Sequence, residues 1–413
     1  MQVEIVTIGD ELLLGLTIDT NGAWLARELA AIGVSIGRRT SVADRAADIA
    51  GAVREALDRG GAVITTGGLG PTSDDLTKPA IAALFGRDLV FDAEQWEHLR
   101  ELWLTRRRAE PPEVNRQQVM IPRGARVLAN RHGSAPGVFL EDDRGRWVAM
   151  MPGVPREMRG MFAEELLPLI RARVGEGATP VRTRTVRSTG IAESSLPEKL
   201  GDAANGIGSL ELSYLPGPEG VDLRLTSRRL DADSAERALG EGATLLMDRV
   251  GAPVYATDLR DLAAVVLDLC RASARRIAVA ESCTGGLLGA RLTAIPGSSD
   301  VFLGGVIAYH NDVKRNALGV SDGLLQTVGA VSDEVARTMA TAVRVRFGAT
   351  IGVGITGVAG PGGGTAEKPV GLVYIAVDLG GEVHSLGSRL IGDREEIRFR
   401  ATQAALDMIR RKL

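Results

Sequence analysis

The chain has 413 residues, more than a single hydrophobic core usually serves, so we expect about two to four domains. Its composition, 45% hydrophobic and 24% charged residues, is ordinary for a globular protein, and no run of about 18 apolar residues indicates a membrane span. A net charge of −3 and an aromatic content of 4% argue against nucleic acid as a direct ligand.

The N-terminal stretch MQVEIVTIGDELLLG carries acids where a signal peptide needs basic residues, so we expect a cytoplasmic protein. Cys270 and Cys283 are the two cysteines of the chain. Two cysteines make no disulfide framework, and neither lies in a cluster with zinc-site spacing.

The first part of the chain alternates expected strands with expected helices. The strands are Val3–Ile8, Val34–Val42 and Ala62–Thr66, and the helices cover Asp19–Leu29, Ala47–Leu57 and Asp74–Phe85. Such alternation predicts a mostly parallel sheet with helices on both faces, and it continues to about Arg173.

The middle of the chain has a different pattern. We expect a strand at Val181–Thr189, a helix at Glu193–Ala204, a hairpin of Leu210–Tyr214 with Val221–Ser227, and a helix at Asp231–Val250. These elements form a small βαββα module. Gly, Pro and Asp residues in Gly251–Asp258 predict a linker after it.

The last part is expected to form a second layered α/β domain. We expect helices at Leu259–Ala274, after AESCTGG to Leu292, at Ser332–Arg346 and at Glu395–Ile409. We expect strands at Ile277–Val279, Phe302–Tyr309, Thr350–Ile355 and Val370–Asp378. The fold prediction is therefore α/β: two layered α/β domains with mostly parallel sheets, at residues 1–173 and 257–413, joined by the module at 174–252.

Glycine-rich loops follow three of the first domain's expected strands, at residues 9–11, 67–75 and 152–155. Ligands of open α/β sheets bind where strands end, and glycines let backbone N–H groups approach a phosphate. Asp74 and Asp75 suit a hard divalent cation, although either could simply cap the following helix. The loop lacks the Lys-Ser/Thr of a P-loop, which argues against that type of ATP hydrolysis.

These loops, together with DTNGAWLA, Asn130–Gly137 and MPGVPREM, resemble the N-terminal domain of the CinA family, which is similar to molybdopterin-binding proteins. The resemblance implies a metal-dependent ADP-ribose pyrophosphatase, with a divalent metal ion, alone or together with a monovalent ion, held by Asp74, Asp75 and Glu11. The implied phosphate- and substrate-binding residues are Gly9, Asn21, Gly67, Gly68, Gly70, Thr72, Asn130 and Gly153. A catalytically silent, nucleotide-sensing domain is the alternative.

The family places a KH-like domain in the middle of the chain, and the βαββα order agrees with it. RNA-binding KH domains clamp the backbone with a GxxG loop. The one candidate, Gly217–Gly220, lies in a hairpin and contains an acid. We therefore expect a structural or dimer-forming role for the module, and a homodimer overall.

The segment AESCTGG, residues 280–286, places three potential nucleophiles in a row at a strand–helix junction. Backbone N–H groups from Cys283 to Gly286 would be unpaired there and could serve a phosphate or an oxyanion. A serine needs a base, and Lys314 could act as one if burial lowers its pKa. The Cys283 thiol at a helix N-terminus is a rival nucleophile, and these residues alone do not decide between Ser282 and Cys283.

From about Leu259 to Leu413 the chain resembles the nicotinamide-nucleotide amidase family, through AESCTGG, YHNDVK, GAVS, TGVAGPGGG, EKPVG and GDR in that order. The resemblance implies cofactor-free hydrolysis of nicotinamide mononucleotide to nicotinate mononucleotide and ammonia. It assigns the attack to Ser282, with Lys314 as base, and gives Cys283 a packing part. The implied substrate-binding residues are Thr284, Gly285, Gly286, Tyr309, Asn311, Thr356, Gly357, Gly360, Gly362 and Arg394.

The function expected from both resemblances is a bifunctional enzyme of pyridine-nucleotide recycling, acting on nicotinamide mononucleotide and ADP-ribose. One alternative is an amidase whose N-terminal domain only senses nucleotides. The other is an interaction protein associated with competence or recombination, which would act through protein partners because nucleic-acid signatures are lacking.

Overall fold

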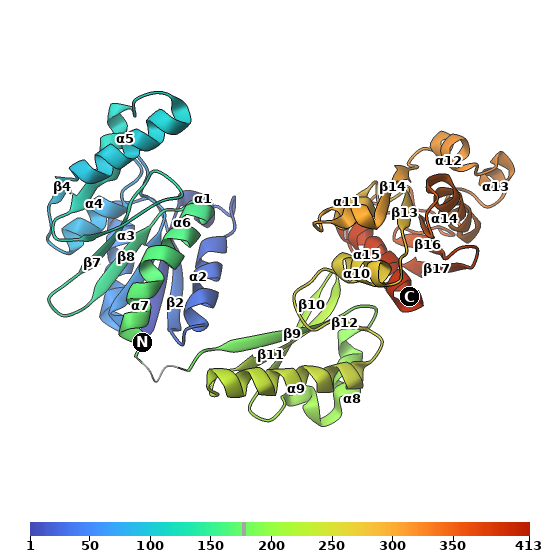
Figure 1. Ribbon diagram of the computed structural model, residues 1–413, viewed down its shortest axis with the longest axis horizontal. Coiled ribbons are helices and arrows are strands. Elements are labelled where there is room, and N and C mark those ends of the chain that lie inside the picture. Colours follow the sequence, from blue (N-terminus) through green and yellow to red (C-terminus); the bar gives the residue numbers. More distant parts are fainter. Residues whose placement is uncertain (176–178) are drawn as a thin grey trace. The chain divides into compact units, whose positions relative to one another are not determined.

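The computed structural model describes residues 1–175 and 179–413. They form two compact units, residues 1–182 with 228–235 and residues 183–227 with 236–413. The first unit holds a six-stranded sheet and a small two-stranded one, and the second unit holds a four-stranded and a five-stranded sheet (Figure 1). Among the described residues, no helix has the length and apolar character needed to cross a membrane.

The first unit is built on a six-stranded sheet in the order β2-β1-β3-β8-β7-β6. Its strands are β1 (Gln2–Ile8), β2 (Ser35–Val42), β3 (Ala62–Thr66), β6 (Arg126–Leu128), β7 (Gly137–Glu141) and β8 (Trp147–Met151). Strands β2, β1, β3 and β8 pair in parallel, whereas β7 runs antiparallel to both β8 and β6. The mostly parallel sheet is confirmed, and its antiparallel edge was not predicted.

Helices cover both faces of this sheet. The helices of this unit are α1 (Asp10–Leu13), α2 (Thr20–Ala30), α3 (Ala46–Gly60), α4 (Thr77–Leu84), α5 (Ala93–Arg107), α6 (Pro155–Met161) and α7 (Leu167–Val174). A π-turn at Phe162–Leu166 and a 3-10 turn at Glu113–Val119 complete it, and β4 (Leu89–Phe91) pairs antiparallel with β5 (Met120–Pro122) in a separate small sheet. Because neighbouring residues of a strand point to opposite faces, Ile5 packs with Leu25 of α2 while Val6 packs with Ile49 of α3.

The middle module is a four-stranded sheet in the order β10-β11-β9-β12. Its elements are β9 (Arg182–Ser188), α8 (Leu196–Leu200), β10 (Glu211–Gly217), β11 (Gly220–Ser227), α9 (Ala232–Val250) and β12 (Val254–Ala256), with 3-10 turns at Glu193–Ser195 and Gly201–Asn205. Two expectations were wrong. The segment expected as a linker contains β12, whose Val254 pairs with Ser188 of β9. The single helix expected at 193–204 is broken, because Gly201 adopts a positive φ of 57°.

The C-terminal domain is a five-stranded sheet in the order β14-β13-β15-β16-β17. Its elements are α10 (Leu262–Ala272), β13 (Ile277–Glu281), α11 (Leu287–Thr293), a 3-10 turn (Ser298–Asp300), β14 (Phe302–Ile307), α12 (Asn311–Leu318), α13 (Asp322–Thr327), α14 (Asp333–Phe347), β15 (Ile351–Gly357), β16 (Leu372–Asp378), β17 (Val383–Arg389) and α15 (Arg394–Lys412). Strand β13 pairs in parallel with β14 and β15, whereas β15, β16 and β17 are antiparallel.

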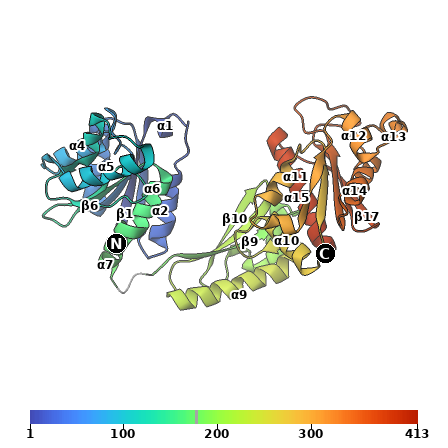
Figure 2. The same ribbon diagram turned by 45° about the horizontal axis from the view of Figure 1, so that its top comes forward.

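Two layers of helices enclose this sheet. The larger core joins α10, α11 and α15 to one face of the sheet, and a second core joins α14 and the α12–α13 region to the other. Figure 2 shows α11 and α15 on one side of the strands and α14 on the other. Strand β17 was not predicted. The parallel trio β14-β13-β15 brings three strand ends to one edge, where AESCTGG lies.

Candidate active site

Ser282 and Lys314 come together at the carboxyl ends of the three parallel strands. Ser282 directly follows β13, and its N–H donates to the Ile355 carbonyl of β15 at 2.9 Å. Lys314 lies on α12, and its Nζ lies 3.0 Å from Ser282 Oγ. Both side chains are buried, with exposed fractions of 8% for the serine and 1% for the lysine. The sequence predicted this pair, and the fold brings it within hydrogen-bonding distance.

The surroundings of Lys314 favour its neutral amine. Its Nζ also donates to the backbone carbonyls of Ala308 at 2.8 Å and Tyr309 at 3.3 Å. Burial lowers the pKa of Lys314, because a charged ammonium loses its hydration there. Among the described residues, no carboxylate forms an ion pair with it. A neutral amine can give its two protons to the two carbonyls and keep its lone pair for the serine hydroxyl.

Cys283 has the opposite character to that of a nucleophilic cysteine. Its side chain is 7% exposed and packs in the large core of the domain. Burial raises the pKa of this thiol to about 12. Since the thiolate is the reactive form, the thiol is a weak nucleophile near neutral pH. Burial and the raised pKa of its thiol therefore favour Ser282 over Cys283, and the assignment of the nucleophile stays a prediction.

The loop that carries Ser282 is fixed by charged neighbours. Buried Glu281 accepts hydrogen bonds from the N–H groups of Gly286 (3.0 Å), Leu288 (3.0 Å) and Gly289 (2.8 Å) at the start of α11. Arg398 of α15 donates twice to the Thr284 carbonyl, at 3.2 and 2.7 Å. A carboxylate at a helix N-terminus is stabilised by unpaired N–H groups and the helix dipole. Sequence reasoning missed Glu281 and Arg398.

These bonds change the role expected for the last residues of AESCTGG. Gly285 N–H donates to the Ser282 carbonyl and Gly286 N–H to Glu281, while the Thr284 side chain is fully buried. The N–H groups of Gly285 and Gly286 are thus paired within the loop, so these hydrogen bonds do not support the prediction that the two glycines bind substrate. In the described part of the chain, no oxygen accepts from the N–H groups of Cys283 and Thr284, so these two remain available to an oxyanion.

A cavity of about 310 Å³ opens in front of Ser282 and Lys314. It is lined by Ser282, Cys283, Tyr309, Asn311, Lys314, Ala330, Val331, residues 356–360, Gly362, Gly363 and Arg394. The fold therefore brings Tyr309, Asn311, Thr356, Gly357, Gly360, Gly362 and Arg394 together as predicted. Thr356 is 1% exposed, and its hydroxyl donates to the Ala330 carbonyl at 2.7 Å.

Arg394, the first residue of α15, spans the mouth of this cavity. Its guanidinium donates to Tyr309 Oη at 2.8 Å and to the Gly360 carbonyl at 2.6 Å. Tyr309 is 59% exposed, so this arginine–tyrosine contact lies at the surface. His310 is not part of the chemistry, because its Nδ1 accepts from the Asp312 N–H to cap α12 and its ring is largely exposed.

In the N-terminal domain, the predicted residues divide into two groups. Glu11, Asn21 and Gly153 line one cavity of about 110 Å³, together with Asp19 and Thr66. Asn21 Nδ2 donates to the Gly153 carbonyl at 2.7 Å, whereas its buried Oδ1 has no partner among the described residues. An unpaired buried oxygen beside a cavity indicates a place for a ligand or water.

Glycine is required where β3 and β8 end beside this cavity. Gly67 has a φ of 106°, and a Cβ on it would lie 2.2 Å from the Ile8 carbonyl oxygen. A Cβ on Gly153 would lie 3.4 Å from the Gly67 Cα, so the two backbones nearly touch. Gly9 ends β1 at the same edge, where its N–H donates to the Val42 carbonyl. The close packing of these glycines leaves the strand ends open to a ligand.

The second group, around Asp75, is held by hydrogen bonds within its own loop. Asp75 accepts from the Gly70 N–H at 2.7 Å, the Thr72 N–H at 2.9 Å and the Thr72 hydroxyl at 2.5 Å. This closed turn delays α4 to Thr77, whose hydroxyl packs against Gly68. The carboxylate of Asp75 therefore holds its own loop, and Gly70 and Thr72 are occupied by it.

The predicted metal ligands do not fit a metal site. Among residues 1–175 and 179–413, no three His, Cys, Asp or Glu side chains are close enough together to hold a metal ion. Asp74 is exposed, and a hydrogen bond from Thr72 lowers its pKa. Glu11 lines the small cavity instead. The prediction that Asp74, Asp75 and Glu11 form one ligand set is thus not supported by their arrangement.

Two further residues of the N-terminal domain differ from expectation. Asn130 donates to the Ala135 carbonyl and Glu157 and accepts from the His132 N–H, so its amide fixes a loop rather than facing a ligand. Asp44, which was not predicted, follows β2 and accepts from the Asp10 N–H at 2.9 Å. Burial, together with nearby carboxylates that include Asp10, raises the pKa of Asp44.

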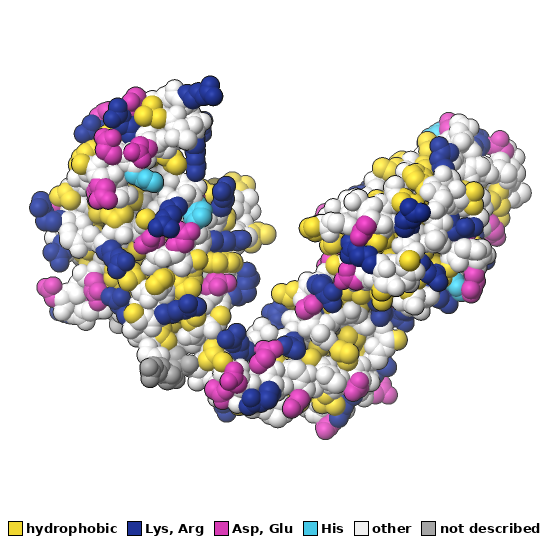
Figure 3. Space-filling model, in the orientation of Figure 1, with side chains coloured by type: hydrophobic (Ala, Val, Ile, Leu, Met, Phe, Trp, Pro, Cys, Tyr) yellow, Lys and Arg dark blue, Asp and Glu magenta, His cyan; other side chains and the backbone are white. Residues whose placement is uncertain are grey.

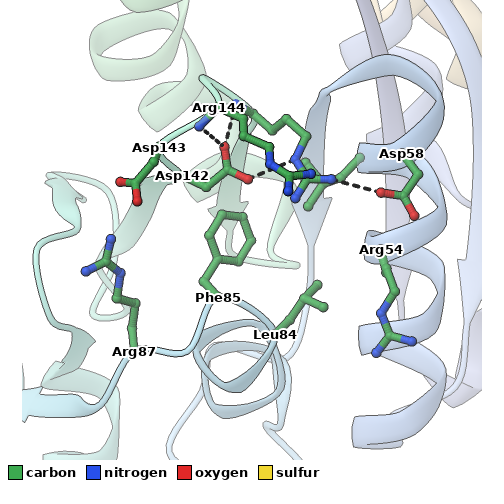
Figure 4. Close-up of a pocket in the computed structure, with 10 residues that line it drawn as sticks. Arg54, Asp58, Leu84, Phe85, Arg87, Asp142, Asp143 and Arg144 are labelled. Carbon is green, nitrogen blue, oxygen red and sulfur yellow. Dashed lines mark hydrogen bonds and ion pairs between the residues drawn. The ribbon is translucent and has the colours of Figure 1, made fainter.

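A separate cavity of about 420 Å³ lies at the opposite edge of this sheet, between the end of α3, the turn after α4 and the β7–β8 turn (Figure 4). Arg146 connects its walls by donating to Asp142 and Asp58, each at 2.8 Å. In the close-up, Phe85 lies between Arg87 and Leu84, below Asp142. These ion pairs hold the β7–β8 turn against α3, which is a structural role. The cavity is remote from the carboxyl ends of the parallel strands, where ligands of such sheets bind.

The face drawn in Figure 3 shows basic and acidic side chains side by side, interspersed over both units. A nucleic-acid track needs Lys and Arg gathered along one groove or stripe. The expectation that nucleic acid is not a direct ligand stays a prediction.

Comparison with known proteins gives three family matches along the chain. Residues 4–172 match the probable molybdopterin binding domain, residues 183–256 the KH domain of the damage-inducible protein CinA, and residues 259–413 the CinA C-terminal domain. The KH match includes β12, in agreement with the four-stranded sheet.

Full-length relatives are similar over the whole chain. A CinA-like protein of Gemmatimonas aurantiaca is 59% identical over 411 residues, covering 100% of this chain and 96% of the relative. A putative competence-damage inducible protein of Moorella thermoacetica is 42% identical over 413 residues, covering 100% and 99%. The crystal structure of the competence/damage inducible protein CihA from Agrobacterium tumefaciens is 43% identical and covers 36% of this chain and 92% of its own, with a TM-score of 0.36.

Proposed function

The chain belongs to the CinA family, and on that premise we propose that its C-terminal domain hydrolyses the carboxamide of nicotinamide mononucleotide, giving nicotinate mononucleotide and ammonia. The observation that carries the proposal is the buried contact of 3.0 Å between Lys314 Nζ and Ser282 Oγ. Amide hydrolysis needs a nucleophile, a base that later becomes an acid, and donors for an oxyanion.

The proposed reaction has two halves. In the first, neutral Lys314 takes the Ser282 proton while Oγ attacks the carboxamide carbon, and the oxyanion is stabilised by the N–H groups of Cys283 and Thr284. The lysine ammonium then protonates the leaving nitrogen, so that ammonia departs and an ester on Ser282 remains. In the second half, Lys314 removes a proton from water as the water oxygen attacks the ester carbon. The bond from that carbon to Ser282 Oγ then breaks, the lysine ammonium returns its proton to Oγ, and the product acid ionises to the carboxylate as it leaves.

The cavity supplies the groups that would orient this substrate. We propose that Arg394 binds the phosphate, since a guanidinium can hold two phosphate oxygens at once. Tyr309 and Asn311, on the same rim, would contact the pyridine ring and its carboxamide. The glycines of 357–363 let the backbone come close to the nucleotide. No cofactor takes part in this proposal.

Two substitutions test the nucleophile. We expect Ser282→Ala to abolish ammonia release from nicotinamide mononucleotide, and Cys283→Ala to retain measurable activity. The opposite pattern would overturn the assignment. Ammonia release by the wild-type protein also separates this function from the alternative of a competence- or recombination-associated interaction protein, which requires no such activity.

We propose further that the N-terminal domain hydrolyses ADP-ribose with the help of a divalent metal ion. Support comes from the unpaired Asn21 Oδ1 beside a cavity at the ends of β1, β3 and β8. Because the predicted acids do not form a ligand set, we derive no metal-borne step. ADP-ribose turnover with a panel of divalent metals, for wild type and Asp75→Ala, tests the proposal. Binding without turnover under every metal would instead make the domain a nucleotide sensor.

Two assembly-level proposals accompany these activities. A homodimer is expected, since it is the commonest soluble assembly, and sedimentation of the purified full chain measures it. A cytoplasmic location is expected as well, and fractionation of producing cells would test it.

A further inference from the structure

A second, larger cavity lies outside both proposed sites, in the unit that contains the middle module and the C-terminal domain. Its volume is about 730 Å³, within the range typical of small-molecule sites. One wall is the loop after β9 and the β10–β11 tip, and the other is β17 with the second half of α15. We call it the α15 cleft. Outside the lining, Arg410 joins α15 to the middle module by donating to the carbonyls of Ala252 and Val254.

One face of α15 is turned toward the α15 cleft. Arg400, Gln403, Ala404, Asp407, Met408 and Arg411 line it, a spacing of three and four residues that follows one side of a helix. The opposite side of α15, including Ala401, Leu406 and Ile409, packs in the domain core. Apolar side chains complete the cleft, among them Ile191, Leu386 and Leu390.

The acids of the α15 cleft are neutralised by neighbours. Glu219 pairs with Arg187 of β9. Asp407 accepts from Arg410 at 2.6 Å and from Arg411 at 2.7 Å. The charge that the cleft presents to a ligand therefore comes from its basic side chains that have no acidic partner.

The donors of the α15 cleft, in contrast, have spare capacity. The side chains of Arg400 and Lys412 form no hydrogen bond or ion pair within the described ranges 1–175 and 179–413, and the Arg400 Nε is buried. Gln403 is 3% exposed, and its Nε2 lacks an acceptor in the same ranges. Its other amide atom, Oε1, accepts from Arg291 of α11 at 2.8 Å, which fixes the amide's orientation. Buried donors are normally paired, so acceptors are missing here.

From this arrangement we propose that the α15 cleft binds a small organic anion with a flat ring, of the size of a nucleoside monophosphate. The anionic group is held by Arg400, while Lys412, about 18 Å further along α15 by helical rise, adds a positive charge at the other end of the cleft. An acceptor on the ring takes the hydrogen bond offered by Gln403 Nε2. The ring packs on the apolar side chains of Leu386, Leu390 and Met408. The proposal does not depend on the amidase or pyrophosphatase activity, because it concerns binding at a third location.

The probe is AMP, with adenosine and inorganic phosphate as its two halves, each titrated into the full chain by calorimetry. We expect AMP to bind at least tenfold more tightly than either half. Arg400→Ala should weaken AMP binding at least tenfold and Lys412→Ala at least threefold. Arg389→Ala, an exposed arginine on β17 outside the cleft, should leave the Kd unchanged. Arg394→Ala, which alters the amidase cavity, should not weaken it either.

Photolabelling with 8-azido-AMP locates the bound probe directly. We expect the labelled peptides to come from residues 384–390 or 400–412. Label confined to the amidase cavity or to the N-terminal domain would overturn the proposal. It would be overturned equally by no AMP binding at millimolar concentration, by phosphate binding as tightly as AMP, or by an unchanged Kd in a folded Arg400→Ala protein. Dissociation of a dimer by Lys412→Ala would show that a second copy fills the cleft instead.

Discussion

Replacing Lys314 by methionine tests the proposed base with little change in shape. Methionine keeps an unbranched side chain of similar length but has neither a lone pair for the serine proton nor a proton for the leaving nitrogen. Two carbonyls, those of Ala308 and Tyr309, lose a donor, while the protein no longer buries an amine. These effects oppose each other, so we expect the free energy of unfolding to change by less than about 2 kcal/mol.

The kinetic effect should be far larger. A positioned general base contributes about 10²–10⁴-fold to a rate. At about 1.36 kcal/mol for each factor of ten, the Lys314→Met variant should lose roughly 2.7–5.4 kcal/mol of transition-state stabilisation. The loss should appear in kcat, because the lysine touches the nucleophile and not the ring or phosphate of the substrate. KM should change little by comparison.

The pH dependence gives an independent check. The base must be neutral, so kcat/KM of the wild type should rise with pH through the Lys314 pKa, with a midpoint below the ordinary lysine value of 10.5. Between the folded and unfolded pKa values the unfolded chain binds more protons. The stability of wild type relative to Lys314→Met should therefore rise with pH up to the unfolded value and fall as pH drops.

Initial rates of ammonia release from nicotinamide mononucleotide, measured from pH 6 to the limit of stability, provide the assay. Thermal unfolding of the same samples confirms that the variant is folded. A folded Lys314→Met protein that keeps a tenth or more of the wild-type kcat would refute the assignment, as would a residual rate with the same rising limb. Arg389→Ala serves as a control for the loss of an unrelated basic residue.

Three further predictions concern the same cavity and its supports. Thiol reagents such as DTNB should modify Cys283 and Cys270 slowly in the folded protein at pH 7.5, because burial raises the pKa of each thiol to about 12; rapid colour development before unfolding would contradict this. Glu281→Gln should lower the free energy of unfolding by about 1–3 kcal/mol in urea titrations, since one amide cannot accept from three N–H groups, and an unchanged midpoint would argue against the loop-fixing role. Arg394→Ala should raise KM for nicotinamide mononucleotide at least tenfold with a smaller change in kcat, whereas a pure kcat effect would exclude phosphate binding.

The sequence predicted elements best where periodicity and strand ends coincide. AESCTGG follows a short apolar strand, and YHNDVK follows another, so parallel strands bring Ser282 and Lys314 to one edge. Strand β17 escaped prediction because its sequence, VHSLGSR, is polar and lies at the sheet edge, where burial is incomplete. Strand β12 was mistaken for a linker because its three residues adjoin Gly251 and Pro253, which usually mark loops.

Donor and acceptor assignments were harder to predict than positions. An apolar pattern places a residue on a strand or helix but does not say which N–H groups are already paired. Gly286 was expected to face substrate, yet Glu281 consumes its N–H. Asp75 was expected to face a metal, yet Gly70 and Thr72 consume both carboxylate oxygens. An acid at the end of a strand, four residues before the glycine pair that precedes α11, was the available signal for Glu281.

Because the Cys283 thiol is buried and its pKa is raised, it should resist oxidation by peroxide. Peroxide attacks the thiolate, and the first step toward sulfenic acid therefore requires a deprotonated, accessible sulfur. Cys283 is neither, although its sulfur lies beside the proposed nucleophile. A hydrolase that attacks with the Ser282 hydroxyl has a nucleophile that peroxide does not oxidise, whereas the catalytic thiolate of a cysteine hydrolase is oxidised and the enzyme is inactivated. The proposed amidase activity should consequently persist at peroxide concentrations that inactivate enzymes with a catalytic thiolate.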